Sequence, residues 1–342
     1  MSNPYDTKGQ ESFWKRAVAA HAADDICPLP AKRFALDTRD AIATAGSCFA
    51  QNVAKFLKER GAVRFLETEP IGPDQPSFSA LYGNIYTARQ LVQLAKEAMG
   101  ERDPADIVWR RPDGAFVDAL RPTVFAHGFP DAASVLAARK RHLEAVRMLL
   151  SQCTVFVFTL GLTETWYSAH DGTVYPVAPG VAAEPPQRND FEFRNFTYDE
   201  VVGDLRRFVA LMRRVNEPAR ILLTISPVPL VATYTDEHVL VATTHSKAIL
   251  RAAASALAAE NLNVYYFPAY EIITGNFNRG RYFGENLRTI TPEGVAHVMR
   301  VFEAAYGLDK APAPSRPASP LFSDTDETVI CDEEEIVKSL GF

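Results

Sequence analysis

The stretch TVFVFTLGLTE, residues 154–164, decides the fold. Residues 154–160 are mainly β-branched or aromatic without polar alternation, which predicts a central strand buried on both faces. Four further apolar runs predict strands of the same kind, at residues 41–45, 62–66, 220–225 and 264–267. Segments with helical periodicity lie between them, at residues 49–60, 87–99, 132–150, 197–215, 243–260 and 292–306. The alternation predicts an α/β fold with a mostly parallel sheet and helices on both faces.

Two segments depart from this alternation. Residues 166–196 are rich in glycine and proline, which predicts a long irregular excursion of the kind that forms lids or substrate-binding surfaces. After Gly307, prolines and serines lead into an acidic run at residues 332–335, which predicts a linker and a short terminal helix. We therefore expect one α/β domain over residues 1–307 and a tail over residues 308–342.

The composition excludes several classes of protein. A net charge of −6 and a pI near 5.7 argue against nucleic acid or an anionic membrane as partner. The polar start of the chain lacks a secretory signal and no apolar run has the length of a membrane span, so we expect a cytoplasmic protein.

The chain contains no metal-ligand spacing, Rossmann fingerprint or P-loop, so we expect no metal and no cofactor. The oligomeric state is not indicated. The cysteines are far apart and are expected to be reduced: Cys27, Cys48, Cys153 and Cys331.

Ser47 is the first candidate for chemistry. It follows Gly46 at the end of the first apolar run and precedes a helix, so its hydroxyl would project from a tight turn near backbone N–H groups. A serine nucleophile needs that geometry. Two alternatives remain open: Ser47 could simply cap the helix, or the neighbouring Cys48 could be the nucleophile.

Several ordered blocks of the sequence resemble the GSCFA family, a branch of the SGNH-hydrolase superfamily with a flavodoxin-like α/β fold. The resemblance covers about residues 4–307, and its blocks lie at residues 46–50, 82–86, 158–164, 226–230, 246–247, 266–271 and 294–299. An ordered series of this length is a far more specific signal than the first pentapeptide alone.

The resemblance implies roles for individual residues. Ser47 would be the nucleophile, and its own N–H and Gly83, with Asn84 beside it, would contribute to the oxyanion hole. The superfamily's Gly-x-Asn-Asp motif corresponds to residues 161–164, where Thr163 replaces the asparagine and Glu164 the aspartate. Thr163 is thus a substitute oxyanion donor. Apart from the resemblance, three residues are candidates for substrate binding: Glu164, Trp166, and Arg288, whose guanidinium could clamp a phosphate or a carboxylate.

The expected catalytic Asp-x-x-His pair before the last helix is missing. Residues 285–292 offer either Asn286 with Thr289 or Arg288 with Thr291 in those places, and neither pair contains an imidazole. Without a base, a serine is a poor nucleophile. The alternatives for the base are His297 on the final helix, His245 on the preceding one, and Lys247, which could also bind an anionic group of the substrate.

The residues and the resemblance together lead to two functional hypotheses. The first is an esterase or O-acyltransferase that uses Ser47 to act on a small-molecule or glycan ester, with a carbohydrate hydroxyl as the acceptor in the transfer reaction. The second is a catalytically silent SGNH-like protein that binds a glycan or a partner, which the missing Asp-x-x-His pair favours.

Overall fold

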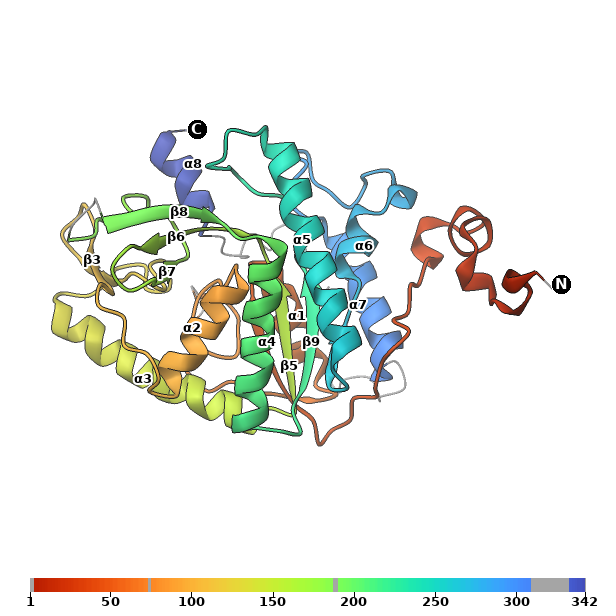
Figure 1. Ribbon diagram of the computed structural model, residues 1–342, viewed down its shortest axis with the longest axis horizontal. Helices are drawn as coiled ribbons and strands as arrows, with labels where there is room; N and C mark the ends of the chain where they lie inside the picture. Colours follow the sequence, from red (N-terminus) through yellow and green to blue (C-terminus); the bar gives the residue numbers. More distant parts are fainter. Residues whose placement is uncertain (1–2, 73–74, 187–189, 309–331, 342) are drawn as a thin grey trace.

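Five parallel strands form the central sheet of the computed structural model, which describes residues 3–72, 75–186, 190–308 and 332–341 (Figure 1). Their order across the sheet is β10-β9-β5-β1-β2, and every neighbouring pair is parallel. The strands are β1 (Ala41–Gly46), β2 (Arg64–Phe65), β5 (Val155–Leu160), β9 (Arg220–Ile225) and β10 (Val264–Tyr266). The five strands predicted from the apolar runs are thereby confirmed.

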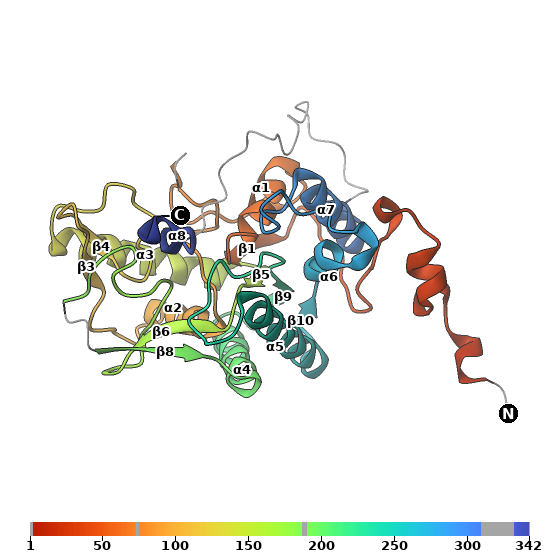
Figure 2. The same ribbon diagram turned by 90° about the horizontal axis from the view of Figure 1, so that it is seen from above.

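Helices cover both faces of this sheet, and two hydrophobic clusters mark the two faces. Phe156 and Phe158 of β5 pack into one cluster with α2 (Ala88–Ala98), α3 (Ala132–Gln152), α4 (Tyr198–Val215) and α5 (Val239–Glu260). Val155 and Val157 point the other way, toward α1 (Ala50–Arg60), α6 (Ala269–Thr274) and α7 (Pro292–Tyr306). Figure 2 shows α4 and α5 on one side of the strands and α1, α6 and α7 on the other. The predicted α/β class with helices on both faces is confirmed.

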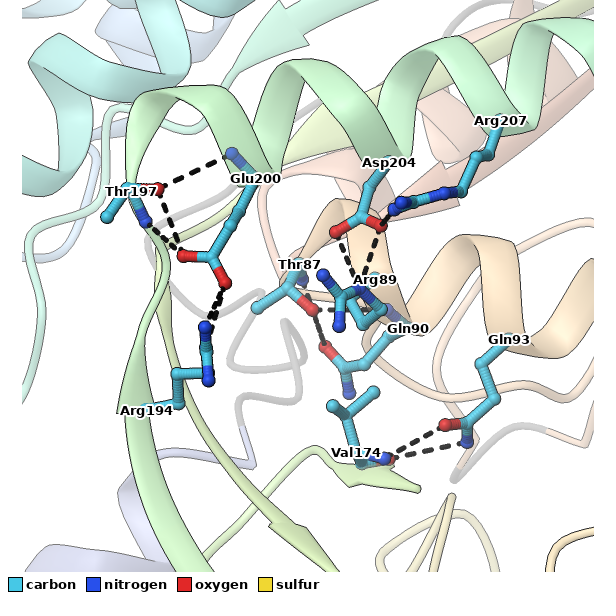
Figure 3. A network of polar contacts seen from close by, with 10 residues as sticks. All are labelled: Thr87, Arg89, Gln90, Gln93, Val174, Arg194, Thr197, Glu200, Asp204 and Arg207. Atoms are coloured by element: carbon cyan, nitrogen blue, oxygen red, sulfur yellow. Dashed lines mark hydrogen bonds and ion pairs between the residues drawn. The ribbon is translucent and has the colours of Figure 1, made fainter. Parts of the chain in front are cut away.

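Capping boxes start α2 and α4, two of the helices on the first face, as Figure 3 shows. In α4, the Thr197 hydroxyl accepts a hydrogen bond from the N–H of Glu200, and the Thr197 N–H donates to the Glu200 carboxylate. Thr87 begins α2 in the same way. Arg89 then joins the two helices, because its guanidinium binds Asp204 of α4 at 2.7 Å.

The glycine- and proline-rich excursion contains more regular structure than the sequence analysis predicted. Within it, β6 (Glu164–Ser168), β7 (Val174–Tyr175) and β8 (Phe191–Asn195) form an antiparallel sheet in the order β7-β6-β8. A hairpin of β3 (Val108–Arg110) and β4 (Phe116–Asp118) precedes it in the chain. The expectation of an irregular segment is corrected here: residues 191–195 read FEFRN, whose aromatic and polar residues alternate with the period of a half-exposed strand.

The two ends of the chain lie on different sides of the molecule in both ribbon views. An N-terminal arm carries short helical turns at Pro4–Thr7, Gln10–Ser12, Lys15–Ala19 and Ala23–Asp25, and another turn, Asn276–Asn278, follows α6. At the C-terminus, α8 (Glu334–Leu340) confirms the predicted terminal helix, whereas most of the predicted linker and Cys331 lie outside the described residues. None of the described helices combines the length and the apolar character that crossing a bilayer requires.

Both edges of the central sheet are short. β2 pairs with β1 through two residues, and β10 pairs with β9 through three. Lys32, from the segment that follows the arm, lies beside β10, where its ammonium donates to the carbonyls of Val264 at 2.8 Å and Asn261 at 2.5 Å.

Candidate functional site

The carboxyl ends of β1 and β5 meet at the centre of the sheet. From β1 the chain turns to β2 on one side, and it later returns to β5, β9 and β10 on the other. In sheets of this strand order, ligands bind at such a switch point, because the loops that leave the two strands diverge and open a crevice. Ser47 follows β1 and Gly161 follows β5, so both residues lie at this switch point.

Gly46 brings the backbone of β1 into close contact with β5. Its φ is 140°, and a Cβ atom added to it would lie 2.4 Å from the carbonyl oxygen of Thr159. The Ser47 N–H donates to that same oxygen at 3.0 Å, and Ile85 N–H donates to the Gly46 carbonyl at 2.8 Å. Only glycine fits this position, which fixes where the chain presents Ser47.

The first testable prediction concerns this glycine. We expect Gly46→Ala to lower the free energy of unfolding by about 3 kcal/mol, because it adds a steric clash to an unfavourable φ. Gly100→Ala is the matched control, since Gly100 also has a positive φ but a Cβ there would meet nothing within 4 Å. Its cost should be near 1 kcal/mol, the backbone term alone. Urea denaturation measures the free energy of unfolding of both variants. Equal decreases would show that the close contact with Thr159 does not contribute to the effect.

Ser47 does not cap the helix that follows it. The N-cap position of α1 belongs to Phe49, and the Ser47 hydroxyl is buried with no hydrogen-bond partner among the described residues. Ser47 is 2 % exposed and lines a small cavity of about 10 Å³, enough for about one water molecule. Thr44, Thr159 and Thr224 also have buried hydroxyls without a partner among the described residues, but of these hydroxyls it is that of Ser47 whose residue lines the cavity at the ligand-binding edge. Cys48 lines the same cavity and is also buried.

Lys247 brings an amine to this cavity. It lies on α5, is 2 % exposed, and its Nζ donates to the Gly161 carbonyl at 2.6 Å. Gly161 in turn touches Ser47, because a Cβ added to Gly161 would lie 3.1 Å from the Ser47 Cβ. The glycine after β5 therefore contacts the candidate nucleophile on one side and the lysine on the other.

The structure does not bring the two candidate histidines to Ser47. The His297 Nδ1 binds the Tyr282 hydroxyl at 2.7 Å, its Nε2 binds the Ile26 carbonyl at 2.6 Å, and burial lowers its pKa. Both nitrogens are thus engaged among α7, the loop before it and the N-terminal segment. His245 is exposed on α5, on a different face of the helix from Lys247. Neither histidine lines the cavity, so neither is placed to act as a base for Ser47.

Two predicted oxyanion donors are also engaged elsewhere. The Thr163 hydroxyl donates to Asn195 of β8 at 2.6 Å, and its N–H donates to the Ser246 hydroxyl at 3.0 Å. Thr163 therefore fastens the small antiparallel sheet to α5. The Ser47 N–H is held by Thr159, as described above.

Asn84 is the predicted oxyanion residue that the fold brings close to the turn after β1. Gly83 precedes it with a φ of 68°, and Ile85 follows it at the hydrogen bond to Gly46. The Asn84 amide accepts from Gln51 at 3.3 Å and donates to the carboxylate of Asp332 at 3.0 Å. Asp332 was not predicted as a site residue.

The three candidates for substrate binding divide into two groups. Glu164 accepts hydrogen bonds from the Thr233 hydroxyl at 2.5 Å and the Tyr234 N–H at 3.0 Å, and Trp166 packs edge to face against Tyr234. These two residues hold the loop that follows β9. Arg288 reaches the site itself, where its guanidinium lies 3.3 Å from the carboxylate of Glu333.

Sequence reasoning missed Asp332 and Glu333 as parts of the site. The acidic run was visible, but Asp332 contacts Asn84 across 248 positions of the chain, and no local pattern signals such a contact. No group of three or more His, Cys, Asp or Glu residues suited to a metal ion occurs in the part of the chain that the structure describes.

Comparison with protein-family models matches residues 41–302 to the GSCFA family, whereas no curated protein matches the chain. The match spans all five strands of the central sheet and includes Ser47, Asn84, Lys247 and Arg288. It covers well over half of the chain, so this protein belongs to the GSCFA family.

Proposed function

We propose that this protein is an SGNH-type esterase or O-acyltransferase in which Ser47 is the nucleophile. The observation that carries the proposal is the buried, unpartnered Ser47 hydroxyl at the switch point of a parallel sheet, in a cavity that also contains Lys247. A serine paired with a lysine is one of the recurring variants of the nucleophile-and-base arrangement.

In this mechanism Lys247 in its neutral form takes the proton from the Ser47 hydroxyl as Ser47 Oγ attacks the ester carbonyl. The Asn84 amide and N–H donate to the oxyanion, and collapse of the tetrahedral intermediate expels the alcohol, which receives the proton from Lys247. The acyl group then remains on Ser47. Water then attacks the acyl group to complete hydrolysis, or an alcohol attacks it to complete transfer, and Lys247 accepts the proton of the incoming hydroxyl. As the bond between the acyl group and Ser47 Oγ breaks, Lys247 returns this proton to Ser47 Oγ.

An aromatic cluster of the small antiparallel sheet and the loop after β9 supports a carbohydrate as the source of that alcohol. Trp166, Phe193 and Tyr234 pack together, with ring centroids 4.7 to 6.0 Å apart, and Tyr234 is 65 % exposed. Glu164 holds the Tyr234 backbone. Exposed aromatic rings present an apolar face with a polar edge, which suits a sugar ring and its hydroxyls.

The test is covalent labelling with a fluorophosphonate probe, followed by mass spectrometry of the modified peptide. We expect the label on Ser47, and we expect Ser47→Ala to abolish it while the unfolding transition stays unchanged. Cys48→Ala is the control in the same cavity and should keep the label. A label that disappears in Cys48→Ala and persists in Ser47→Ala would assign the nucleophile to Cys48.

A catalytically silent protein that binds a glycan or a partner is the second candidate. It is favoured by the cavity lining, which contains no imidazole among the described residues. A folded protein that reacts with neither fluorophosphonate nor a thiol-directed probe at this cavity would support it over the enzyme.

A further inference from the structure

Two carboxylates from the C-terminal tail lie in the candidate active site. Asp332 and Glu333 immediately precede α8, and they are only 2 % and 8 % exposed. Charged side chains are rarely buried to this degree unless partners of opposite charge or hydrogen-bond donors receive them. Their contacts therefore show what the site is able to bind.

Asp332 occupies the donors that the mechanism assigns to the oxyanion. One of its carboxylate oxygens accepts from the Asn84 side-chain amide at 3.0 Å, the Asn84 backbone N–H also donates to the carboxylate, and the other oxygen accepts from the Thr123 hydroxyl. Gln51 donates to the Asn84 carbonyl oxygen and so orients the amide. An anionic oxygen is thus bound by the same donors that would receive a developing oxyanion.

Glu333 lies against the cations of the site and lines the cavity of Ser47. The Arg288 guanidinium lies 3.3 Å from its carboxylate and is itself held by the Pro229 carbonyl at 3.1 Å. Val231 donates a backbone hydrogen bond to Glu333. Burial raises the pKa of Glu333, and the charges of Arg288 and Lys247 oppose that rise.

The tail and a substrate cannot occupy this place together. With Glu333 in position the cavity measures about 10 Å³, which holds one water molecule and no ester group. Seating the tail also costs desolvation, because burial raises the pKa of Asp332 as well as that of Glu333. A segment bound at such a cost is suited to displacement by a ligand.

We propose that Arg288 forms an anion-binding subsite next to the Ser47 cavity and that the substrate carries a carboxylate or another acidic group. Until the substrate binds, Glu333 occupies this subsite and Asp332 occupies the oxyanion donors of Asn84. This inference rests on the proposed function and names the substrate class of the same site. Removing the tail would take the carboxylate of Glu333 away from the largely buried Arg288 guanidinium, and an acidic group of the substrate could replace that charge.

The first arm of the test measures whether the carboxylates of Asp332 and Glu333 hold the tail in the site. In the full-length protein, hydrogen exchange of the α8 amides is followed at short labelling times. We expect the double variant Asp332→Asn, Glu333→Gln to exchange at least about tenfold faster, since tenfold corresponds to the loss of one good contact. Glu335→Gln is the control, because Glu335 pairs with Lys338 on the helix surface, and it should leave exchange unchanged.

The same measurement shows whether a ligand must be negatively charged to displace the tail. The probe is the dipeptide N-acetyl-Asp-Glu-amide, and its uncharged counterpart N-acetyl-Asn-Gln-amide is the control at equal ionic strength. Because the tail belongs to the same chain, its effective concentration is on the order of millimolar, so the dipeptides are used above that level. The acidic dipeptide should speed exchange of α8 in the wild-type protein and the neutral one should not.

The second arm follows fluorophosphonate labelling of Ser47. The double variant should react at least about tenfold faster than wild type, and the acidic dipeptide should slow it again. If hydrogen exchange of α8 is unchanged in the double variant, the proposal that Asp332 and Glu333 hold the tail in the site is wrong. Equal effects of the acidic and neutral dipeptides would overturn the anion subsite. Failure of the proposed function looks different: Ser47 stays unlabelled in every variant while the exchange responses remain.

Discussion

Replacing Lys247 by methionine is expected to slow the reaction of Ser47 with a fluorophosphonate, and with any ester substrate, by about three orders of magnitude. General-base catalysis by a positioned side chain contributes about this much. Among the described residues that line the cavity, the basic nitrogen is that of Lys247. Methionine has a similar length and no proton-accepting nitrogen, so the packing of α5 should survive while the base is lost.

A second substitution separates two roles of this lysine. Lys247→Arg keeps a positive charge but cannot lose its proton at neutral pH. If Lys247 is the base, the arginine variant should be as slow as the methionine variant. If it only holds the carbonyl of Gly161 or an anionic substrate group, the arginine variant should retain much of the rate. His245→Gln is the control on the exposed face of the same helix and should react like wild type.

The other large effect is expected from Asp118→Asn, which should lower the free energy of unfolding by about 3 to 5 kcal/mol. Asp118 ends β4 and is 2 % exposed, and its carboxylate binds Arg121 at 2.8 Å and Arg139 at 3.3 Å. Burial raises its pKa, but the charges of Arg139 and Arg121 outweigh that effect and hold the pKa below its usual value. Without that negative charge, the buried Arg121 would lose its ion pair, and Arg139 would keep its ion pair with Glu97.

This network also supports the site, so the variant has a second readout. Arg121 donates to the Leu81 carbonyl at 2.8 Å, and the segment that follows carries Asn84. Guanidinium denaturation gives the stability, and the labelling rate of Ser47 reports on the segment. Glu260→Gln is the control, because Glu260 pairs with Arg206 at the surface and its loss should be negligible. An Asp118→Asn protein as stable as wild type would mean that the buried ion pairs contribute no net stability.

The strands and helices of the central domain could be predicted because their signals are local. The five apolar runs and the capping pattern at Thr197 each occupy a few consecutive residues, and the structure confirms them. The strand β8 was missed because its alternation lies inside a segment dominated by glycine and proline, whose turn signals suggested loops throughout.

The candidate site was harder to predict, because its members meet only in the folded chain. Ser47 could be predicted because a glycine precedes it. Gly46 lies so close to Thr159 that no other residue fits there, and this requirement is visible in the sequence. His297 was attractive because the final helix follows the expected catalytic block, yet its side chain faces Tyr282 and Ile26. Asp332 lies beside Asn84 only because of the path of the whole chain between them, and no sequence motif signals a contact between residues so far apart.

The short edges of the central sheet bear on how copies of this protein can associate. An open edge recruits a strand from another molecule only when it offers a row of unpaired backbone groups. Here β2 is two residues long and β10 three, and Lys32 already takes up the Val264 carbonyl at the β10 edge. Continuation of the sheet from one copy into the next is therefore disfavoured at both ends. Any assembly of this chain is therefore expected to use elements other than the edges of the central sheet, because the short edge strands protect that sheet against edge-to-edge aggregation.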